Sequence, residues 1–263
     1  MPTPAFRDRR AAESFGVDAA RYDRTRPRYP VALIERLAAP EVLDVGIGTG
    51  IVARQLRDAG SHVTGVEPDP RMAAFARDNG FDVEVGTFEQ WDPAGRLFDA
   101  VVAGQTWHWV EPEGGAANAA SALRPGGRLA LFWNAGQPSH EAAAAFAEIY
   151  ERLMPGSRLA AAYRSMVSAA QGYSMLVDKA DEAIAATGAF LPPERWTAEW
   201  EQVYTRDEWL DQLPTQGLLT TLPADEIEAL SSATGAAVDA LGGSFPMRFT
   251  TLATIATKDA APR

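Results

Sequence analysis

The 263-residue sequence contains no cysteine. Disulfide bonds, thiolate nucleophiles and cysteine-ligated zinc sites are therefore excluded. Histidine is almost as scarce, because His62, His108 and His140 are the only three and show neither HxxxH nor HxH spacing. We therefore expect no metal site, since imidazole and thiolate are the ligands that zinc and copper favour. The lack of cysteine agrees with a reducing compartment, and we expect a cytoplasmic protein.

Positive charge and long apolar runs are also missing. The 24 Lys and Arg residues are outnumbered by 35 Asp and Glu residues, which gives a net charge of −11. Nucleic-acid affinity depends on basic side chains that neutralise phosphates, so neither nucleic acid nor an anionic membrane is an expected partner. No apolar run approaches the roughly 18 residues of a membrane-spanning helix. The opening MPTPAFRDRRAAESF lacks the continuous apolar segment of a secretory signal.

What the sequence does contain is an alternation of short apolar segments with segments of helical periodicity. Such alternation is typical of βαβ units, in which helices cover both faces of a parallel sheet. The predicted strands are 41–46, 62–67, 81–86, 97–104 and 128–134, and the predicted helices between them are 49–60, 69–80 and 113–124. Beyond these lie Ala-rich helical sequence at 139–190, a strand at 195–204, helices at 206–213 and 224–241, and a β-rich segment at 245–258.

A glycine-rich turn follows the first predicted strand. In LDVGIGTGIVA (43–53), Gly46, Gly48 and Gly50 allow a tight turn and let a ligand approach the backbone closely. The helix that follows offers free N–H groups and the positive end of its dipole. About 20 residues further on, Glu67 ends the second strand, where a carboxylate can accept hydrogen bonds from both hydroxyls of a ribose. This order predicts a site for a nucleoside-containing cofactor.

The spacing within the turn bears on which cofactor binds. A dinucleotide loop usually reads GxGxxG, whereas this one reads GxGxG. Asp44 stands two residues before the first glycine, where its charge would repel a pyrophosphate and suit an ammonium group. Both details favour S-adenosylmethionine. An NAD-dependent oxidoreductase remains the alternative, although the sequence has no Tyr-x-x-x-Lys dyad. A non-catalytic cofactor-binding protein is the third reading.

The motifs DVGIGTG, GVEPD, GTFEQWD, GQTWHW and LRPGGRLALFWN occur in this order. Together they resemble class I S-adenosylmethionine-dependent methyltransferases of the small-molecule type. YDRTRPRYP resembles the N-terminal segment that closes over the cofactor in some of these enzymes. The resemblance covers residues 20–134 well and barely covers 137–193.

The resemblance implies an α/β fold with a Rossmann-like, mostly parallel seven-stranded sheet, helices on both faces and a helical insertion after strand five. We expect four parts along the chain. They are an N-terminal helical segment that closes over the cofactor (1–40), the cofactor-binding α/β core (41–136), a helical insertion or lid (137–193), and the strands and helices that complete the same sheet (194–263).

The resemblance also implies roles for individual residues. Arg26 is a candidate for the methionine carboxylate, or else merely a solvated arginine. Phe88 either flanks the adenine or belongs to the core, and Glu89 is a substitute for Thr87 opposite the adenine amino group. The predicted cofactor contacts are Tyr22, Arg26, Asp44, Gly46, Gly48, Gly50, Glu67, Pro68, Thr87, Phe88 and Gln105.

His108 lies in GQTWHWV, just after the fourth strand, where the methyl acceptor would sit. It is a candidate general base, because an ordinary imidazole pKa near roughly 6.5 suits that role. The alternative is that His108 shapes the wall of the pocket. The aromatic residues and methionines of 146–175 form either an ordinary helical core or an apolar lid. An apolar or aromatic acceptor is predicted from such a lid alone.

Overall fold

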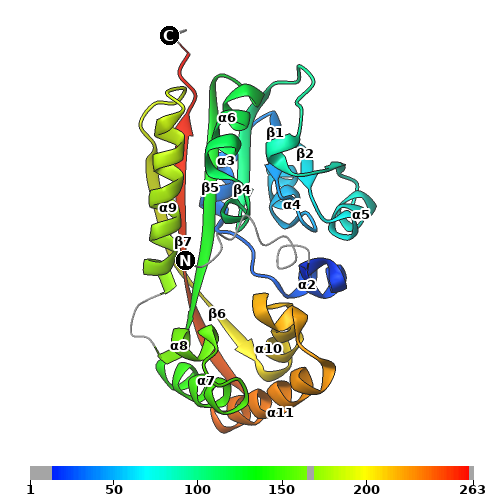
Figure 1. Ribbon diagram of the computed structural model, residues 1–263, viewed down its shortest axis with the longest axis vertical. Coiled ribbons are helices and arrows are strands. Elements are labelled where there is room, and N and C mark those ends of the chain that lie inside the picture. Colours follow the sequence, from blue (N-terminus) through cyan, green and yellow to red (C-terminus); the bar gives the residue numbers. More distant parts are fainter. Residues whose placement is uncertain (1–13, 165–168, 261–263) are drawn as a thin grey trace.

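The computed structural model describes residues 14–164 and 169–260. Within these ranges a single seven-stranded sheet has the order β3-β2-β1-β4-β5-β7-β6 (Figure 1). Neighbours from β3 to β5 pair in parallel, whereas β7 is antiparallel to both β5 and β6. The strands are β1 (Glu41–Val45), β2 (His62–Glu67), β3 (Asp82–Val85), β4 (Phe98–Gly104), β5 (Leu123–Pro138), β6 (Glu194–Thr205) and β7 (Ser244–Thr257).

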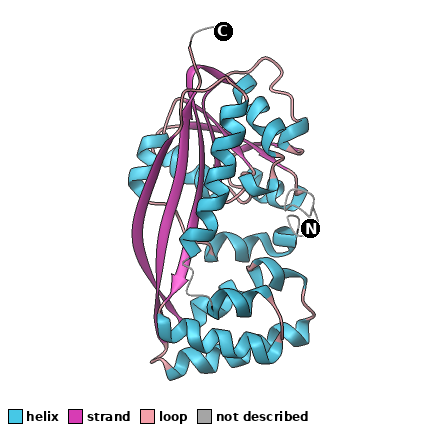
Figure 2. Cartoon of the chain, turned by 60° about the vertical axis from the view of Figure 1, so that its left-hand side comes forward, coloured by secondary structure: helices cyan, strands magenta, loops and turns pink. Residues whose placement is uncertain are grey.

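Helices cover both faces of the parallel strands (Figure 2). The α-helices are α2 (Ala19–Thr25), α3 (Val31–Leu37), α4 (Ile51–Asp58), α5 (Pro70–Asp78), α6 (Pro112–Ala122), α7 (His140–Leu153), α8 (Arg158–Arg164), α9 (Ala169–Ala186), α10 (Arg206–Gln212) and α11 (Ala224–Ala240). Short 3-10 helices are η2 (Ser14–Asp18), η3 (Phe88–Gln90), η4 (Trp107–Trp109), η5 (Leu213–Thr215) and η6 (Gly217–Thr221).

The strands are buried on both faces because their side chains alternate in direction. On β1, Val42 packs with the helices α3, α4 and α5, whereas Leu43 and Val45 pack on the opposite side with α6 and α9. Nearly continuous apolar sequence is what a doubly covered parallel strand requires. The predicted α/β sheet with helices on both faces is thereby confirmed.

A separate group of helices forms a cap at the far end of the long antiparallel strands. We define the cap as residues 140–164 and 206–240, which contain α7, α8, α10, η5, η6 and α11. Its core contains Phe146, Tyr150 and Trp209, all almost inaccessible to solvent. Phe146 stacks on Trp209 with ring centroids 5.7 Å apart. In the described part of the chain, these aromatic side chains therefore fill the interior of the cap itself.

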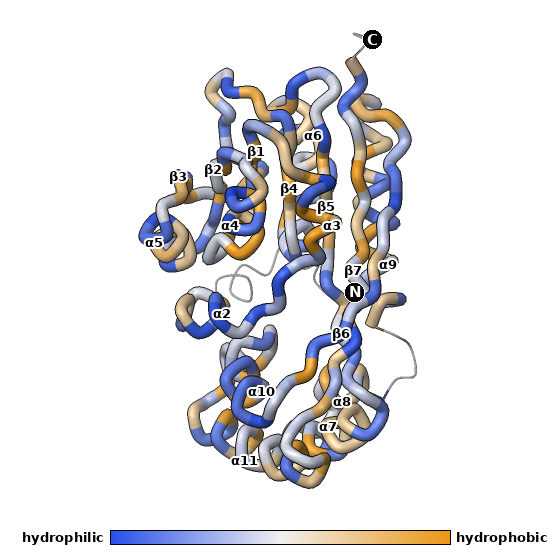
Figure 3. The backbone as a smooth tube through the Cα atoms, turned by 180° about the vertical axis from the view of Figure 1, so that it is seen from behind, coloured by the Kyte–Doolittle hydropathy of each residue, from blue (hydrophilic) through white to orange (hydrophobic). Residues whose placement is uncertain are grey.

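The N-terminal segment, residues 14–30, lies between the parallel strands and the cap. We call the parallel strands and the helices that cover them the body. Figure 3 places α2 between α5 of the body and α10 of the cap. The guanidinium of Arg24 donates two hydrogen bonds to the carboxylate of Asp211, at 2.7 and 2.6 Å. On the other side, Gly16 packs so closely on Asp69 that a Cβ there would lie 2.0 Å from its Oδ2. The N-terminal segment thus contacts both the body and the cap. The part of the predicted N-terminal region before residue 14 lies outside the described residues.

Strand five is longer than the sequence predicted. The sequence predicts a strand at 128–134, but β5 begins at Leu123, directly after α6, and includes Gly126 and Gly127. The pairing between β4 and β5 shifts between Phe98 and Ala100, so the glycines form an irregularity within the strand. Gly126 has φ +78°, a left-handed value that a side chain disfavours. Backbone pairing with β4 therefore extends the strand back across these two glycines.

Candidate active site

The glycine turn joins the carboxyl end of β1 to the start of α4. Gly46, Gly48 and Gly50 have φ values of +65°, +57° and +88°, a region that L side chains rarely adopt. A Cβ on Gly46 would lie 2.1 Å from Cγ2 of Thr106, so that position also lacks space. The turn lies beside the boundary between β1 and β4, where the order of the strands along the chain reverses. Ligands of open α/β sheets bind at such a point.

Two carboxylates converge on this turn. Asp44 is only 1% exposed, and its buried Oδ2 has no hydrogen-bond partner. Burial, and secondarily the charge of Glu67, holds the pKa of Asp44 well above its usual value. Glu67 accepts hydrogen bonds from the backbone N–H groups of Gly48 and Asp69, both at 2.9 Å. Burial nevertheless raises the pKa of Glu67 to about 7.

The residues expected near the adenine are divided between the site and the core. Thr87 is partly exposed at the start of η3, directly beyond β3. Phe88 points into the core, with its ring 6.1 Å from that of Trp107. Glu89 is engaged elsewhere, because its Oε1 accepts a 2.6 Å hydrogen bond from the backbone of Glu111. Pro68 is partly exposed after β2.

Gln105 follows β4 and has an unusual backbone conformation for its residue type, with φ +57°. Its backbone N–H donates to the carbonyl of Phe132 at 2.8 Å. Its side-chain Nε2 donates to the carbonyl of Asn134 at 2.9 Å. The side-chain Oε1 is buried without a partner. These bonds hold the Gln105 side chain at the carboxyl ends of β4 and β5, with one acceptor left for a ligand.

His108 lies in η4 against the end of β5. Its Nδ1 is 3.3 Å from Nε1 of Trp133, an indole nitrogen that can only donate. Nδ1 is therefore the acceptor, and the neutral ring carries its proton on Nε2. Burial lowers the pKa of His108 to about 4. The neighbouring Trp109 faces Phe15 of the N-terminal segment, with ring centroids 6.4 Å apart.

Three side chains of the N-terminal segment, Tyr22, Arg26 and Tyr29, lie near the carboxyl ends of the parallel strands. The Arg26 guanidinium lies 4.7 Å from the centroid of the Tyr22 ring. Arg26 Nη2 donates to the backbone carbonyl of Thr215 in the cap. Tyr29 is buried edge-to-face on Phe132, with centroids 4.8 Å apart. Burial raises its pKa well above the ordinary value.

The structure thus gathers most of the predicted residues at one edge of the sheet. Asp44, Glu67 and the three glycines form one group, Gln105 and His108 come from the segment after β4, and Tyr22 and Arg26 come from the N-terminal segment. Phe88 is separated from them, because it points into the core. Thr106 was not among the predicted residues, and its Oγ1 lies 3.3 Å from the carbonyl of Gly46. Only the pairing of β1 with β4 brings these two residues together.

Asn134 was also missed. Its Oδ1 accepts from Oγ1 of Thr251 at 2.7 Å, and its Nδ2 donates to the carbonyl of Arg28 at 3.2 Å. It therefore connects β5, β7 and the N-terminal segment. A polar residue at the end of the apolar run LALFWN was the available signal.

Among residues 14–164 and 169–260, no group of three or more His, Cys, Asp or Glu side chains is arranged to hold a metal ion. The same ranges contain no helix with the length and apolar character needed to cross a bilayer.

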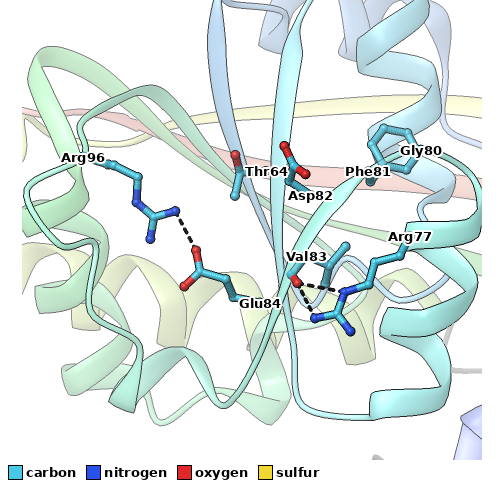
Figure 4. A pocket seen from close by; sticks show the side chains of 8 residues that line it. All are labelled: Thr64, Arg77, Gly80, Phe81, Asp82, Val83, Glu84 and Arg96. Carbon is cyan, nitrogen blue, oxygen red and sulfur yellow. Dashed lines mark hydrogen bonds and ion pairs between the residues drawn. The ribbon is translucent and has the colours of Figure 1, made fainter.

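An open hollow elsewhere on the surface is separate from this site (Figure 4). It lies along β3, the edge strand. Arg96 pairs with Glu84 on one side of it, and Arg77 donates to the carbonyl of Val83 on the other. Both arginines of the hollow are therefore engaged by groups of the protein itself.

Comparison with known proteins identifies the central segment. Residues 43–131, which contain the glycine turn, Glu67 and Gln105, match the family model described as a methyltransferase domain. Over these residues the chain is similar to a methyltransferase domain. The match thus covers β1 through most of β5, the strands around which the candidate site is built.

Curated relatives match over the same region. An uncharacterized methyltransferase of Mycobacterium tuberculosis is 40% identical over 129 residues, which are 46% of this chain and 52% of that protein. The ubiquinone biosynthesis O-methyltransferase of Methylocella silvestris is 32% identical over 111 residues, 40% of this chain and 42% of that protein. The chain therefore spans about half the length of the curated relatives it matches.

Solved structures extend the likeness in fold beyond the methyltransferase domain. A protein assigned as a type II methyltransferase from Anaeromyxobacter dehalogenans has a TM-score of 0.56 at 23% identity and covers 90% of this chain and 99% of its own. Phosphoethanolamine N-methyltransferase 2 of Haemonchus contortus has a TM-score of 0.51 at 16% identity, over 97% of this chain and 59% of that one. At these identities the likeness is one of fold.

Proposed function

We propose that the protein transfers a methyl group from S-adenosylmethionine to a small-molecule acceptor. The observation that carries the proposal is the glycine turn with its two buried carboxylates, inside a segment that matches the methyltransferase domain. An ammonium and a ribose need acceptors, and the turn presents acceptors next to backbone that a ligand can approach closely.

The hydrogen-bonding groups of the site fit this cofactor. Oδ2 of Asp44 and Oε1 of Gln105 are buried acceptors without partners, and both lie at the carboxyl ends of the parallel strands. They would hold the methionine part, and the Glu67 carboxylate would exchange its bond to Gly48 for the ribose hydroxyls. The cofactor supplies an activated methyl group on a positively charged sulfur. The task of the protein is to align the acceptor with that methyl, because displacement in line depends on position.

His108 belongs to the wall of this site in our proposal. Its Nδ1 is occupied by the Trp133 indole, and burial favours the neutral ring. A base with a pKa near 4 is poorly matched to removing a proton at neutral pH, where the optimum pKa lies near the working pH. The ring instead fixes η4 against β5 and so positions the aromatic side chains beside the acceptor.

Calorimetry with S-adenosylhomocysteine tests the proposal. We expect micromolar binding by the wild type and a loss of at least tenfold in Asp44→Asn, because that carboxylate would meet the ammonium. Glu199→Gln on the exposed face of β6 is the matched control and should bind normally. Absence of binding at millimolar ligand, with NAD binding in its place, would favour the oxidoreductase alternative. Release of S-adenosylhomocysteine with a panel of acceptors then separates an enzyme from a non-catalytic binding protein.

A further inference from the structure

Arg26 lies where the N-terminal segment, the parallel strands and the cap meet. One of its N–H groups, on Nη2, donates to the backbone of Thr215 in the cap. A second, on Nε, is buried and has no partner. The guanidinium carbon lies over the ring of Tyr22. These contacts hold the guanidinium in place and leave a buried donor unused.

Three nearby arginines, Arg21, Arg24 and Arg54, are paired with acids, and the partly buried Arg26 is not. Arg21 and Arg24 both contact Asp211, and Arg54 contacts Asp23. Among the described residues, no carboxylate forms an ion pair with Arg26. The chain carries 35 acidic residues against 24 basic ones, so acids are not scarce. A partly buried cation without a counter-charge is costly, and a bound anion removes that cost.

Three phenols lie near Arg26. Its charge lowers the pKa of Tyr29, Tyr173 and Tyr204 against the dominant effect of burial, so the guanidinium lies within electrostatic reach of all three phenols. The hydroxyl of Tyr204 and Nε2 of Gln216 are buried without partners. Phenol hydroxyls, an amide NH₂ and a guanidinium all suit an acceptor-rich ligand group.

We propose that Arg26 binds a carboxylate of the methyl acceptor, so that the substrate class is a small organic acid. This inference rests on the proposed function. Arg26 and a carboxylate form parallel hydrogen bonds that fix the orientation as well as the position of the ligand. The cofactor also has a carboxylate, but Arg26 bonds to the cap through Thr215 and lies within reach of Tyr204, whereas Asp44, Glu67 and the glycine turn lie on the body. In this proposal the acceptor lies between these two sides.

The test compares acids with their neutral counterparts in the presence of S-adenosylhomocysteine. Benzoate, cinnamate, hexanoate and succinate are measured beside their primary amides by calorimetry and thermal shift. We expect at least one acid to bind and its amide to bind at least tenfold more weakly. Arg26→Gln should weaken acid binding at least tenfold and leave the affinity for S-adenosylhomocysteine within twofold. Arg28→Gln, an exposed arginine two residues away, should change neither.

The other outcomes overturn the proposal in distinguishable ways. If Arg26→Gln lowers the affinity for S-adenosylhomocysteine at least as much as for the acid, the carboxylate that Arg26 binds is that of the cofactor. If amides bind as well as acids, or no acid binds to protein that binds S-adenosylhomocysteine, the acceptor is not an acid. If S-adenosylhomocysteine itself does not bind to the wild type, the proposed function fails first. Arg26→Lys retains the charge and controls for misfolding, and should recover part of the acid affinity.

Discussion

The indole N–H of Trp133 donates to Nδ1 of His108, and this contact joins the end of β5 to the segment after β4. It determines the tautomer of the histidine, because an indole nitrogen cannot accept. The bond links two adjacent strands at the edge where the cofactor and acceptor would meet. His108 is one of only three histidines in the chain, and its Nδ1 is thereby occupied by a structural hydrogen bond.

Replacement of His108 by Gln should reduce turnover by less than tenfold. Glutamine retains a polar side chain but cannot act as a base, and loss of a general base typically costs about 10² to 10⁴-fold. The measurement is kcat with any acceptor that the wild type methylates, together with the affinity for S-adenosylhomocysteine. His140→Gln, at the exposed first residue of α7, is the control. A fall of a hundredfold in kcat with unchanged binding would show that His108 is the base after all.

Glu67 should make the stability of the ligand-free protein depend on pH. Its folded pKa of about 7 lies above the ordinary value of 4.5, so the folded protein retains this proton over a pH range in which the unfolded chain releases it. Its stabilising contribution is complete below about pH 4.5 and is lost as the pH rises through 7. At roughly 1.4 kcal/mol for each pKa unit, the loss approaches ~3 kcal/mol at pH 8.

Glu67→Gln should therefore be more stable than the wild type at pH 8 and similar at pH 5, while binding S-adenosylhomocysteine at least tenfold more weakly. Urea unfolding at the two pH values measures the first effect and calorimetry the second. Glu199→Gln, on the surface, should leave the difference between pH 5 and pH 8 as it is in the wild type. An equal change at both pH values would mean that Glu67 is not held protonated.

Gly46→Ala should abolish cofactor binding and destabilise the fold by several kcal/mol. The added Cβ meets Thr106 at 2.1 Å, and the φ of +65° is itself unfavourable for alanine by about 1–2 kcal/mol. Gly60→Ala isolates the backbone cost, since its φ is +96° and no atom lies within 4 Å of the added Cβ. Thr106→Gly in the Gly46→Ala background removes the whole clash, since Oγ1 and Cβ of Thr106 would also lie 2.7 and 2.9 Å from the added Cβ. Failure of that second substitution to recover stability would show that strain, not the clash, dominates.

Asp211→Asn should loosen the N-terminal segment. It removes the shared partner of Arg21 and Arg24, which tie the segment to α10 of the cap. We expect the dissociation of S-adenosylhomocysteine to accelerate about threefold to tenfold in low salt, and the difference from the wild type to shrink in high salt because exposed ion pairs are screened. Stopped-flow fluorescence measures the rates. Asp239→Asn, which breaks the contact with Arg206 on the outside of the cap, is the control. Equal rates in both variants would argue against closure by this segment.

The sequence by itself determined the alternation of strands and helices and the position of the turn. Apolar runs of strand length bounded by glycine have few other structures available, and Gly46, Gly48 and Gly50 mark backbone that other residues adopt poorly. The order of Asp44, the turn and Glu67 located the candidate site for the same local reason. The pairing of both carboxylates with that turn follows from adjacent parallel strands.

Only the tertiary structure decided what the side chains of the surrounding wall contact. His108, Phe88 and Arg26 were each open to two interpretations in the sequence, because the alternatives differ only in long-range contacts. Packing placed Phe88 in the core, set Trp133 against His108 and carried Arg26 to the cap at Thr215. Trp133 lies 25 positions from His108, and Thr215 lies 189 positions from Arg26. Burial and hydrogen bonding across such distances set the charge and the direction of a side chain, and local sequence does not encode them.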